Sequence, residues 1–151
     1  MNENDDFVGF DVVIGNPPYL VINGGRYNNG GYSNDAISYI RSNYKTGEQQ
    51  INTFPLFIEL TEKILTQKGF NSLIIPNTFL GNEYSNNLRD FIIKKFHIIE
   101  LYNTGSVFDD ASVETIIITC SKKKEEVVTK IIYKNQICEL FGSNKSDKRR
   151  F

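Results

Sequence analysis

The chain has 151 residues and a formal net charge of −1, with a pI near 5.9. This length suits one domain that buries about two thirds of its unfolded surface. The charge balance excludes a nucleic-acid binder that depends on one wholly basic face, so any contact with phosphates must be local.

The sequence also argues against a cysteine-based site, a metal site and a membrane or secreted location. Cys120 and Cys138 form no CxxC pair, so they suggest neither a zinc site nor a disulfide framework, and both are expected to be packing residues. The single His97 cannot assemble a metal site alone, and none is predicted. No apolar stretch is long enough to cross a bilayer, and residues 1–6 are acidic and polar rather than signal-like. We therefore expect a cytoplasmic protein that contacts no membrane.

The hydrophobic pattern predicts alternating strands and helices. Residues 10–14 are an apolar run that is typical of a buried parallel strand. Residues 20–52 are rich in Asn, Gly and Tyr and have weak periodicity, which indicates a long loop that is either functional or disordered, with a short helical turn near residues 35–42. A helix of about 14 residues is expected to start at Thr53 and to be closed by Gly69.

The second half of the chain continues this alternation. Asn82 is expected to cap a second helix, whose apolar stripe includes Tyr84. The strand that covers residues 112–120 must return antiparallel, because the loop before it is too short for a helical crossover. The strands expected in this half cover residues 70–76, 97–103, 112–120 and 127–133.

Asn16-Pro17-Pro18-Tyr19 directly follows the first strand and is the most informative segment. Pro17 and Pro18 fix the backbone and remove two donors, so neither a helix nor a central strand can continue there. The segment is a rigid loop at the carboxyl end of a strand, where open α/β sheets place their ligands. The side-chain oxygen of Asn16 and the carbonyl of Pro17 can accept two hydrogen bonds from one NH2 group. The Tyr19 ring can stack on the attached base.

Residues 9–19 (GFDVVIGNPPY) resemble motif IV of the amino-methyltransferases that use S-adenosylmethionine. The resemblance is strongest to the N6-adenine DNA methyltransferases of bacterial restriction-modification systems of type II, in particular the type IIG-like ones. It implies an α/β fold, a partial Rossmann-like class I methyltransferase sheet of parallel strands with helical crossovers and an antiparallel last strand. Later segments in the family's order are LFIE at 56–59, GFNSLIIPNTFL at 69–80, and VF at 107–108 with SVETIIITC at 112–120.

The resemblance implies adenine-N6 methylation, with Asn16, Pro17, Pro18 and Tyr19 as the catalytic residues. The adenine amine is a poor nucleophile because its lone pair is delocalised into the ring. Asn16 and the Pro17 carbonyl would draw its hydrogens and stabilise the positive charge that develops on nitrogen. A base inside a duplex must first be extruded. Tyr19 and Phe108 are the expected stacking partners of the extruded adenine, each worth about 1 to 3 kcal/mol.

Relatives carry a glycine-rich cofactor loop before motif IV, whereas this chain reaches the motif at Asn16. We therefore expect residues 1–124 to be the carboxy-terminal half of a methyltransferase domain, and residues 125–151 to be an extra strand and polar tail leading out of it. S-adenosylmethionine would be bound mainly by the missing N-terminal half, and the cofactor-binding residues of this chain stay unassigned. The open edge of the first strand predicts that the isolated chain self-associates.

Candidate DNA contacts are three basic residues of the long loop, where they alternate with tyrosines beside the motif: Arg26, Arg41 and Lys45. The alternative is that these residues are ordinary solvated surface. The expected partners are double-stranded DNA, the missing methyltransferase half and a target-recognition domain.

Two other functions stay open at this point. The same Asn-Pro-Pro-Tyr turn occurs in enzymes that methylate another planar amine or amide, such as an RNA base or a protein glutamine. The other alternative is that the chain has no enzymatic activity and acts only as a DNA-binding or folding module. Parallel methyl-transfer assays on DNA, RNA and protein separate these alternatives.

Overall fold

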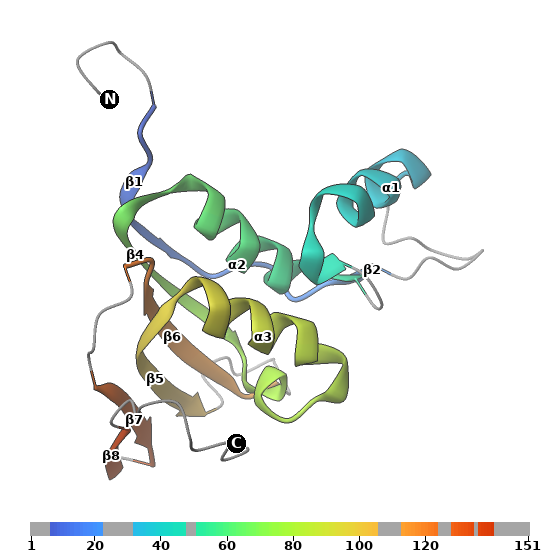
Figure 1. The fold of residues 1–151 in the computed structure, drawn as a ribbon. Helices are drawn as coiled ribbons and strands as arrows, with labels where there is room; N and C mark the ends of the chain where they lie inside the picture. Colours follow the sequence, from blue (N-terminus) through green and yellow to red (C-terminus); the bar gives the residue numbers. More distant parts are fainter. Residues whose placement is uncertain are drawn as a thin grey trace.

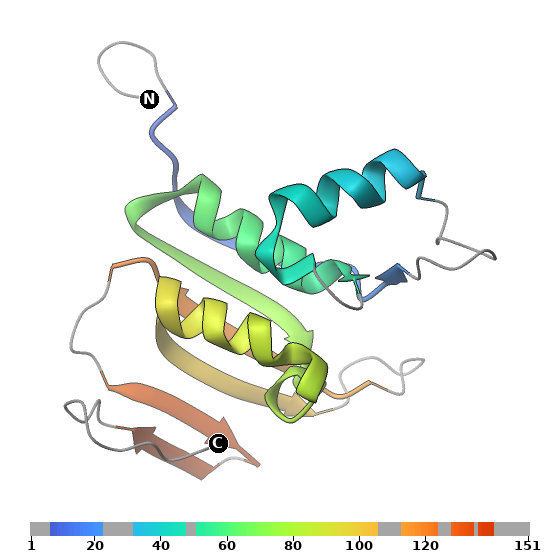
Figure 2. The same cartoon turned by 45° about the vertical axis from the view of Figure 1, so that its right-hand side comes forward.

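The computed structural model describes residues 7–22, 32–47, 51–105, 113–123, 128–134 and 136–140. The main sheet contains β1 (Phe10–Gly15), β4 (Leu65–Pro76), β5 (His97–Gly105), β6 (Thr115–Ser121), β7 (Thr129–Tyr133) and β8 (Gln136–Leu140). These strands pair in the order β1-β4-β6-β5-β7-β8. Helices α2 (Thr53–Ile64) and α3 (Asn86–Lys95) lie on the same face of the sheet (Figures 1 and 2).

The strand directions follow the predicted topology. β1 and β4 are joined through α2 and run parallel, with Val13 beside Asn71 and Gly15 beside Leu73. β6 lies between β4 and β5 and is antiparallel to both, as the short loop before it predicts. β7 runs parallel to β5 and forms a hairpin with β8. The predicted α/β class with an inserted antiparallel strand is confirmed.

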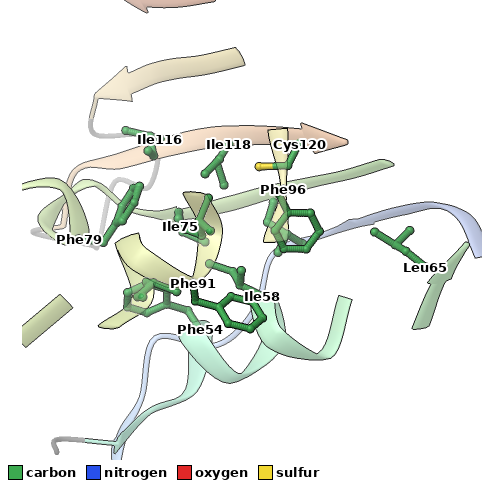
Figure 3. Close-up of a cluster of buried hydrophobic side chains, with 13 residues drawn as sticks. Phe54, Ile58, Leu65, Ile75, Phe79, Phe91, Phe96, Ile116, Ile118 and Cys120 are labelled. Atoms are coloured by element: carbon green, nitrogen blue, oxygen red, sulfur yellow. The ribbon is translucent and has the colours of Figure 1, made fainter. Parts of the chain in front are cut away.

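Apolar side chains of α2, α3 and the covered face of the sheet form one core (Figure 3). Ile75 of β4 is completely buried, and Ile116 and Ile118 of β6 are each 2% exposed. Phe54 of α2 and Phe91 of α3 belong to the same cluster. Burying a large apolar side chain contributes about 1.5 to 3 kcal/mol. This core therefore fixes both helices on the strands that carry the motif.

The segment between β1 and α2 is more structured than a loop. Its helix α1 (Asn34–Asn43) starts after Ser33, whose Oγ accepts a hydrogen bond from the Ala36 N–H at 3.2 Å. The predicted helical turn at residues 35–42 is thus confirmed as a longer helix. The other elements among the described residues of this segment are β2 (Val21–Ile22), the 3-10 turn η1 (Lys45–Gly47) and β3 (Ile51–Asn52), which pairs antiparallel with β2.

Glu59 anchors this segment to α2. It is 3% exposed, and its Oε2 accepts hydrogen bonds from the backbone N–H (3.1 Å) and the hydroxyl (3.2 Å) of Thr46. Lys63, one helical turn later, lies 3.7 Å from Glu59 Oε1 and donates to the Asn43 carbonyl at 3.0 Å. Its ammonium group also lies 4.0 Å from the centre of the Tyr44 ring. These contacts hold the end of α1 and η1 against α2.

The helix predicted to close at Gly69 ends earlier. α2 ends at Ile64, and β4 begins at the next residue and runs through Gly69. A Cβ atom at position 69 would lie 2.8 Å from the carbonyl oxygen of Phe10. Glycine is required there because the two strands approach each other closely. A single glycine in the sequence can mark either a helix end or such a close approach, so the sequence alone did not distinguish them.

The start of α3 also differs from the prediction. Asn82 accepts a hydrogen bond from the Tyr84 N–H at 2.9 Å and so caps the 3-10 turn η3 (Glu83–Ser85) rather than α3. Tyr84 is 70% exposed and does not belong to the apolar stripe. The buried side of α3 consists of Leu88, Phe91 and Ile92.

Two burial expectations were wrong. β1 forms as predicted, but Phe10, Val12 and Ile14 are 52%, 55% and 77% exposed, because alternate side chains of a strand point to opposite faces and these three lie on the face opposite to Val13, which packs on the core. Cys120 is buried as expected, whereas Cys138 is exposed on β8, the outermost strand of the sheet. Within the described ranges, no helix combines the length and apolar character that a membrane span requires.

Candidate active site

Four strands each have one end at the same edge of the sheet. β1 and β4 run parallel, so their carboxyl ends lie together. β5 ends at Gly105 beside Thr115, the first residue of the antiparallel β6. Asn77, just past β4, donates from its backbone N–H to the Glu114 carbonyl (3.0 Å) and from Nδ2 to the Glu114 carboxylate (2.7 Å). The carboxyl ends of β1, β4 and β5 therefore lie at the same edge of the sheet as the start of β6.

Asn16 and Tyr19 are in direct contact at this edge. The Tyr19 hydroxyl lies 2.9 Å from Asn16 Oδ1 and 2.9 Å from the carbonyl oxygen of Ile74. Ile74 stands one residue past the last pair of the β1–β4 ladder, Gly15 with Leu73. The hydroxyl thus binds a strand carbonyl close to the point where β1 turns away. Burial raises the pKa of Tyr19 above its ordinary value, so the phenol stays a protonated donor.

Packing also holds the ring of Tyr19. Its centre lies 6.4 Å from that of Phe54, with an interplanar angle of 87°, so the two rings meet edge to face. Tyr19 is half-buried against the main core, whereas Asn16 is exposed. The loop presents one fixed aromatic ring beside one accessible amide.

The two prolines have different surroundings. Pro17 is buried and Pro18 is exposed. The carbonyl oxygen of Pro18 accepts a hydrogen bond from the Thr53 hydroxyl, whose oxygen in turn accepts from the Leu20 N–H at 3.0 Å. The Thr53 N–H donates to the Leu20 carbonyl at 2.9 Å. Sequence reasoning treated Thr53 only as a helix start, because its local pattern shows no more than a hydroxyl at the first residue of α2.

A cavity of about 250 Å³ adjoins Asn16 between β1 and α2. Its polar lining side chains are Asn16 and Thr61, and the Thr61 hydroxyl accepts a hydrogen bond from Asn71 Nδ2 at 2.8 Å. The other lining residues are apolar or glycine: Val13, Ile14, Gly15, Pro17, Phe57, Leu60, Ile64 and Leu73.

Phe108, the second predicted stacking residue, lies outside the described residues, and so does Arg26. The residue that leads into the Phe108 segment is described: Gly105 has a φ of +67°, and its N–H donates to Asn103 Oδ1 at 2.9 Å. Thr104 next to it donates to the Thr115 carbonyl at 2.8 Å. β5 therefore ends at the same edge of the sheet as β1.

Arg41 and Lys45 lie elsewhere. Both line a separate groove of about 410 Å³, between the end of α1 and the helices α2 and α3. No residue lines both this groove and the cavity beside Asn16. On α2, Glu59 and Lys63 border the groove, whereas Phe57 borders the cavity. The structure thus does not bring Arg41 and Lys45 to the cavity beside Asn16.

Comparisons with known proteins agree with this arrangement. The chain is 26% identical over 119 residues to the type II restriction enzyme and methyltransferase RM.Eco57I of Escherichia coli, covering 78% of this chain and 12% of that protein. It is 29% identical over 130 residues to the type II methyltransferase M.AccI of Acinetobacter calcoaceticus, covering 83% and 23%. The chain therefore spans less than a quarter of the length of these two relatives.

Solved structures share the fold. A candidate class I S-adenosylmethionine-dependent methyltransferase from Listeria monocytogenes superposes with a TM-score of 0.61 at 20% identity, covering 82% of this chain and 37% of the other. The protein DrdV, solved as a complex with DNA, gives a TM-score of 0.58 at 17% identity, covering 80% and 14%. The fold is that of class I methyltransferases. The sequence model of the Eco57I restriction-modification methylase family matches residues 1–108, and the chain belongs to that family.

Proposed function

We propose that this chain supplies the target-base half of the active site of an S-adenosylmethionine-dependent DNA methyltransferase that acts on adenine N6 in a restriction-modification system. The observation that carries the proposal is the Asn16–Tyr19 pair at the carboxyl end of β1, with an exposed amide beside a fixed ring. The resemblance of residues 9–19 to motif IV and the similarity to type II methyltransferases support it.

The proposed chemistry needs two acceptors and no nucleophilic side chain. Asn16 Oδ1 and the Pro17 carbonyl accept the two hydrogens of the exocyclic amine, which lets the nitrogen pyramidalise and frees its lone pair. S-adenosylmethionine, when bound, supplies the electrophilic methyl group, and the amine loses one proton to solvent after transfer. Acceptors that are already fixed act on the positive charge as it develops, with little reorganisation. Tyr19 and Phe108 stack on the extruded base and offset part of the unstacking energy.

Cofactor binding is assigned mainly to a partner half of the enzyme. The side of β1 that faces away from β4 has no neighbour within the described sheet, and its apolar residues Val12 and Ile14 are more than half exposed. These features fit a sheet that continues beyond β1 with cofactor-binding strands. We extend the proposal to a separate target-recognition domain that reads the DNA sequence.

The test is radiolabelled methyl transfer to duplex DNA, RNA and protein in parallel, using the full-length protein that joins this chain to its cofactor-binding half. We expect label in DNA, and in N6-methyladenine after digestion to nucleosides. Label in RNA or in protein glutamine instead would support the alternative amino-methyltransferases. Absence of transfer to all three by a folded, cofactor-binding protein would favour a DNA-binding or folding module.

A further inference from the structure

We infer that Thr53 is a positioning residue for the proposed reaction, because it fixes the loop so that the Pro17 carbonyl stays free for the target amine. This inference rests on the proposed function and adds to it a residue that the motif itself does not contain. Thr53 is the first residue of α2 and is 4% exposed.

Both the hydroxyl and the backbone N–H of Thr53 bind the loop. Its hydroxyl donates to the Pro18 carbonyl and accepts from the Leu20 N–H, and its own N–H donates to the Leu20 carbonyl. A hydroxyl at the N-cap of a helix ordinarily accepts from N–H groups two or three residues further into the helix. Here it binds residues that precede the helix by more than thirty positions.

The consequence concerns the two proline carbonyls of the motif. The Pro18 carbonyl is engaged by Thr53. No hydrogen bond to the Pro17 carbonyl is found within the described part of the chain. Since Pro17 and Pro18 also fix φ, holding the Pro18 carbonyl toward α2 restricts the orientation of the peptide group that precedes it. Thr53 thereby selects which carbonyl is available beside Asn16.

The short strands after the loop extend this attachment. Leu20 leads into β2, where Val21 pairs with Asn52 and Ile22 with Ile51 of β3. Ile22 and Ile51 are 3% and 1% exposed and form part of a small second core. Thr53 therefore connects the motif loop to the β2–β3 pair, which the second core holds in place. A displacement of a reacting group by about 1 Å can lower the reaction rate on the order of 100-fold.

The experiment compares Thr53→Val, which keeps the shape but removes the hydroxyl, with Thr53→Ser, which keeps the hydroxyl. Both are made in the full-length protein, and kcat and KM for methyl transfer are measured together with amide hydrogen exchange at Leu20. We expect Thr53→Val to lower kcat by about 10- to 100-fold with an unchanged KM for S-adenosylmethionine. Exchange at Leu20 should accelerate at least about tenfold, and Thr53→Ser should restore both values to within about threefold.

Thr129→Val is the matched control. Thr129 lies in β7, and its hydroxyl likewise donates to a backbone carbonyl, that of Ile98, at 2.7 Å. Thr129→Val should leave kcat unchanged. The inference is overturned if Thr53→Val keeps wild-type kcat, if Thr53→Ser is as impaired as Thr53→Val, or if Thr129→Val is equally slow. Absence of methyl transfer by the wild-type protein would instead refute the proposed function. Even then, unchanged Leu20 exchange in Thr53→Val would separately refute the loop-fixing role.

Discussion

The phenolic oxygen of Tyr19 lies 2.9 Å from the side-chain oxygen of Asn16. The same hydroxyl lies 2.9 Å from the carbonyl of Ile74 in β4, so its single proton serves two acceptors. The contact links the two residues that the motif separates by two prolines. It places the amide of Asn16 against a group that the sheet and the core hold in place, while leaving Asn16 exposed.

Removing only the hydroxyl, by Tyr19→Phe, should lower kcat about five- to tenfold. The reason is that Asn16 and the Ile74 carbonyl each lose a hydrogen bond, and one such bond is worth about 0.5 to 1.5 kcal/mol. The ring remains, so affinity for DNA with an unpaired target adenine should not change.

Tyr19→Ala is the comparison, because it removes the ring as well. It should weaken binding of that DNA by about 1 to 3 kcal/mol, measured by fluorescence anisotropy. Equal DNA affinities for the Phe and Ala variants would contradict the stacking role of Tyr19.

The isolated chain should form dimers or larger oligomers through β1, whose apolar residues are exposed beside Phe70, which is 45% exposed. Ile14→Lys should shift the chain toward monomer, because Ile14 is 77% exposed and the new charge would face the partner copy. Light scattering after size exclusion gives the mass directly. Ile93→Lys on α3, at a position 57% exposed, is the control and should not alter the mass. A monomeric wild-type chain at high concentration would refute this prediction.

The proposed DNA contacts of Arg41 and Lys45 have a quantitative test. If each neutralises one phosphate, the double substitution to Gln reduces the salt slope of DNA binding by about 2, and affinity falls equally for all sequences. Lys94→Gln is the control, because Lys94 pairs with Asp90 on an exposed side of α3. A slope equal to that of the wild type would show that the groove lined by Arg41 and Lys45 is solvated surface.

Alkaline pH should destabilise the fold through Cys120. Burial raises the pKa of its thiol from 9.0 to about 12, so the folded chain keeps this proton to higher pH than the unfolded chain does. The contribution of the neutral thiol is complete below about pH 9 and is lost between pH 9 and 12, at no more than about 1.4 kcal/mol per pH unit. Urea unfolding of Cys120→Ala should show a shallower decline over this range, whereas Cys138→Ala, at an exposed position, should follow the wild type.

Much of the fold follows from local sequence. A proline pair ends β1, the short connection before β6 forces it antiparallel, and the buried stripe of α3 is visible as Leu88, Phe91 and Ile92. The boundary between α2 and β4 was not predictable, because Gly69 is needed for the close approach of the Phe10 carbonyl in β1 and not to end the helix. The exposure of Val12 and Ile14 likewise could not be predicted, because it depends on what packs on their face of the sheet, and the sequence of β1 does not contain that information.

Some residues of the candidate site can be identified from the sequence, and others only from the fold. Asn16, Pro17 and Tyr19 are contiguous, so the pattern of the motif identifies them directly. Thr53 was missed because its partners Pro18 and Leu20 lie more than thirty residues earlier, and no periodicity connects them. Arg41 and Lys45 lie close to the motif in sequence, but the fold of α1 and η1 carries them to a groove on a different side of α2.

The central claim is that the side chain of Asn16 accepts a hydrogen of the target amine. Asn16→Ala, made in the full-length protein, leaves a loop whose shape is set by Pro17, Pro18 and Thr53 but removes the acceptor. Asn43→Ala, the same change at the far end of α1, serves as the control. We expect methyl transfer to duplex DNA to fall about 100- to 1,000-fold in Asn16→Ala with unchanged S-adenosylmethionine affinity, and to persist in Asn43→Ala. Unchanged turnover of Asn16→Ala would contradict the account.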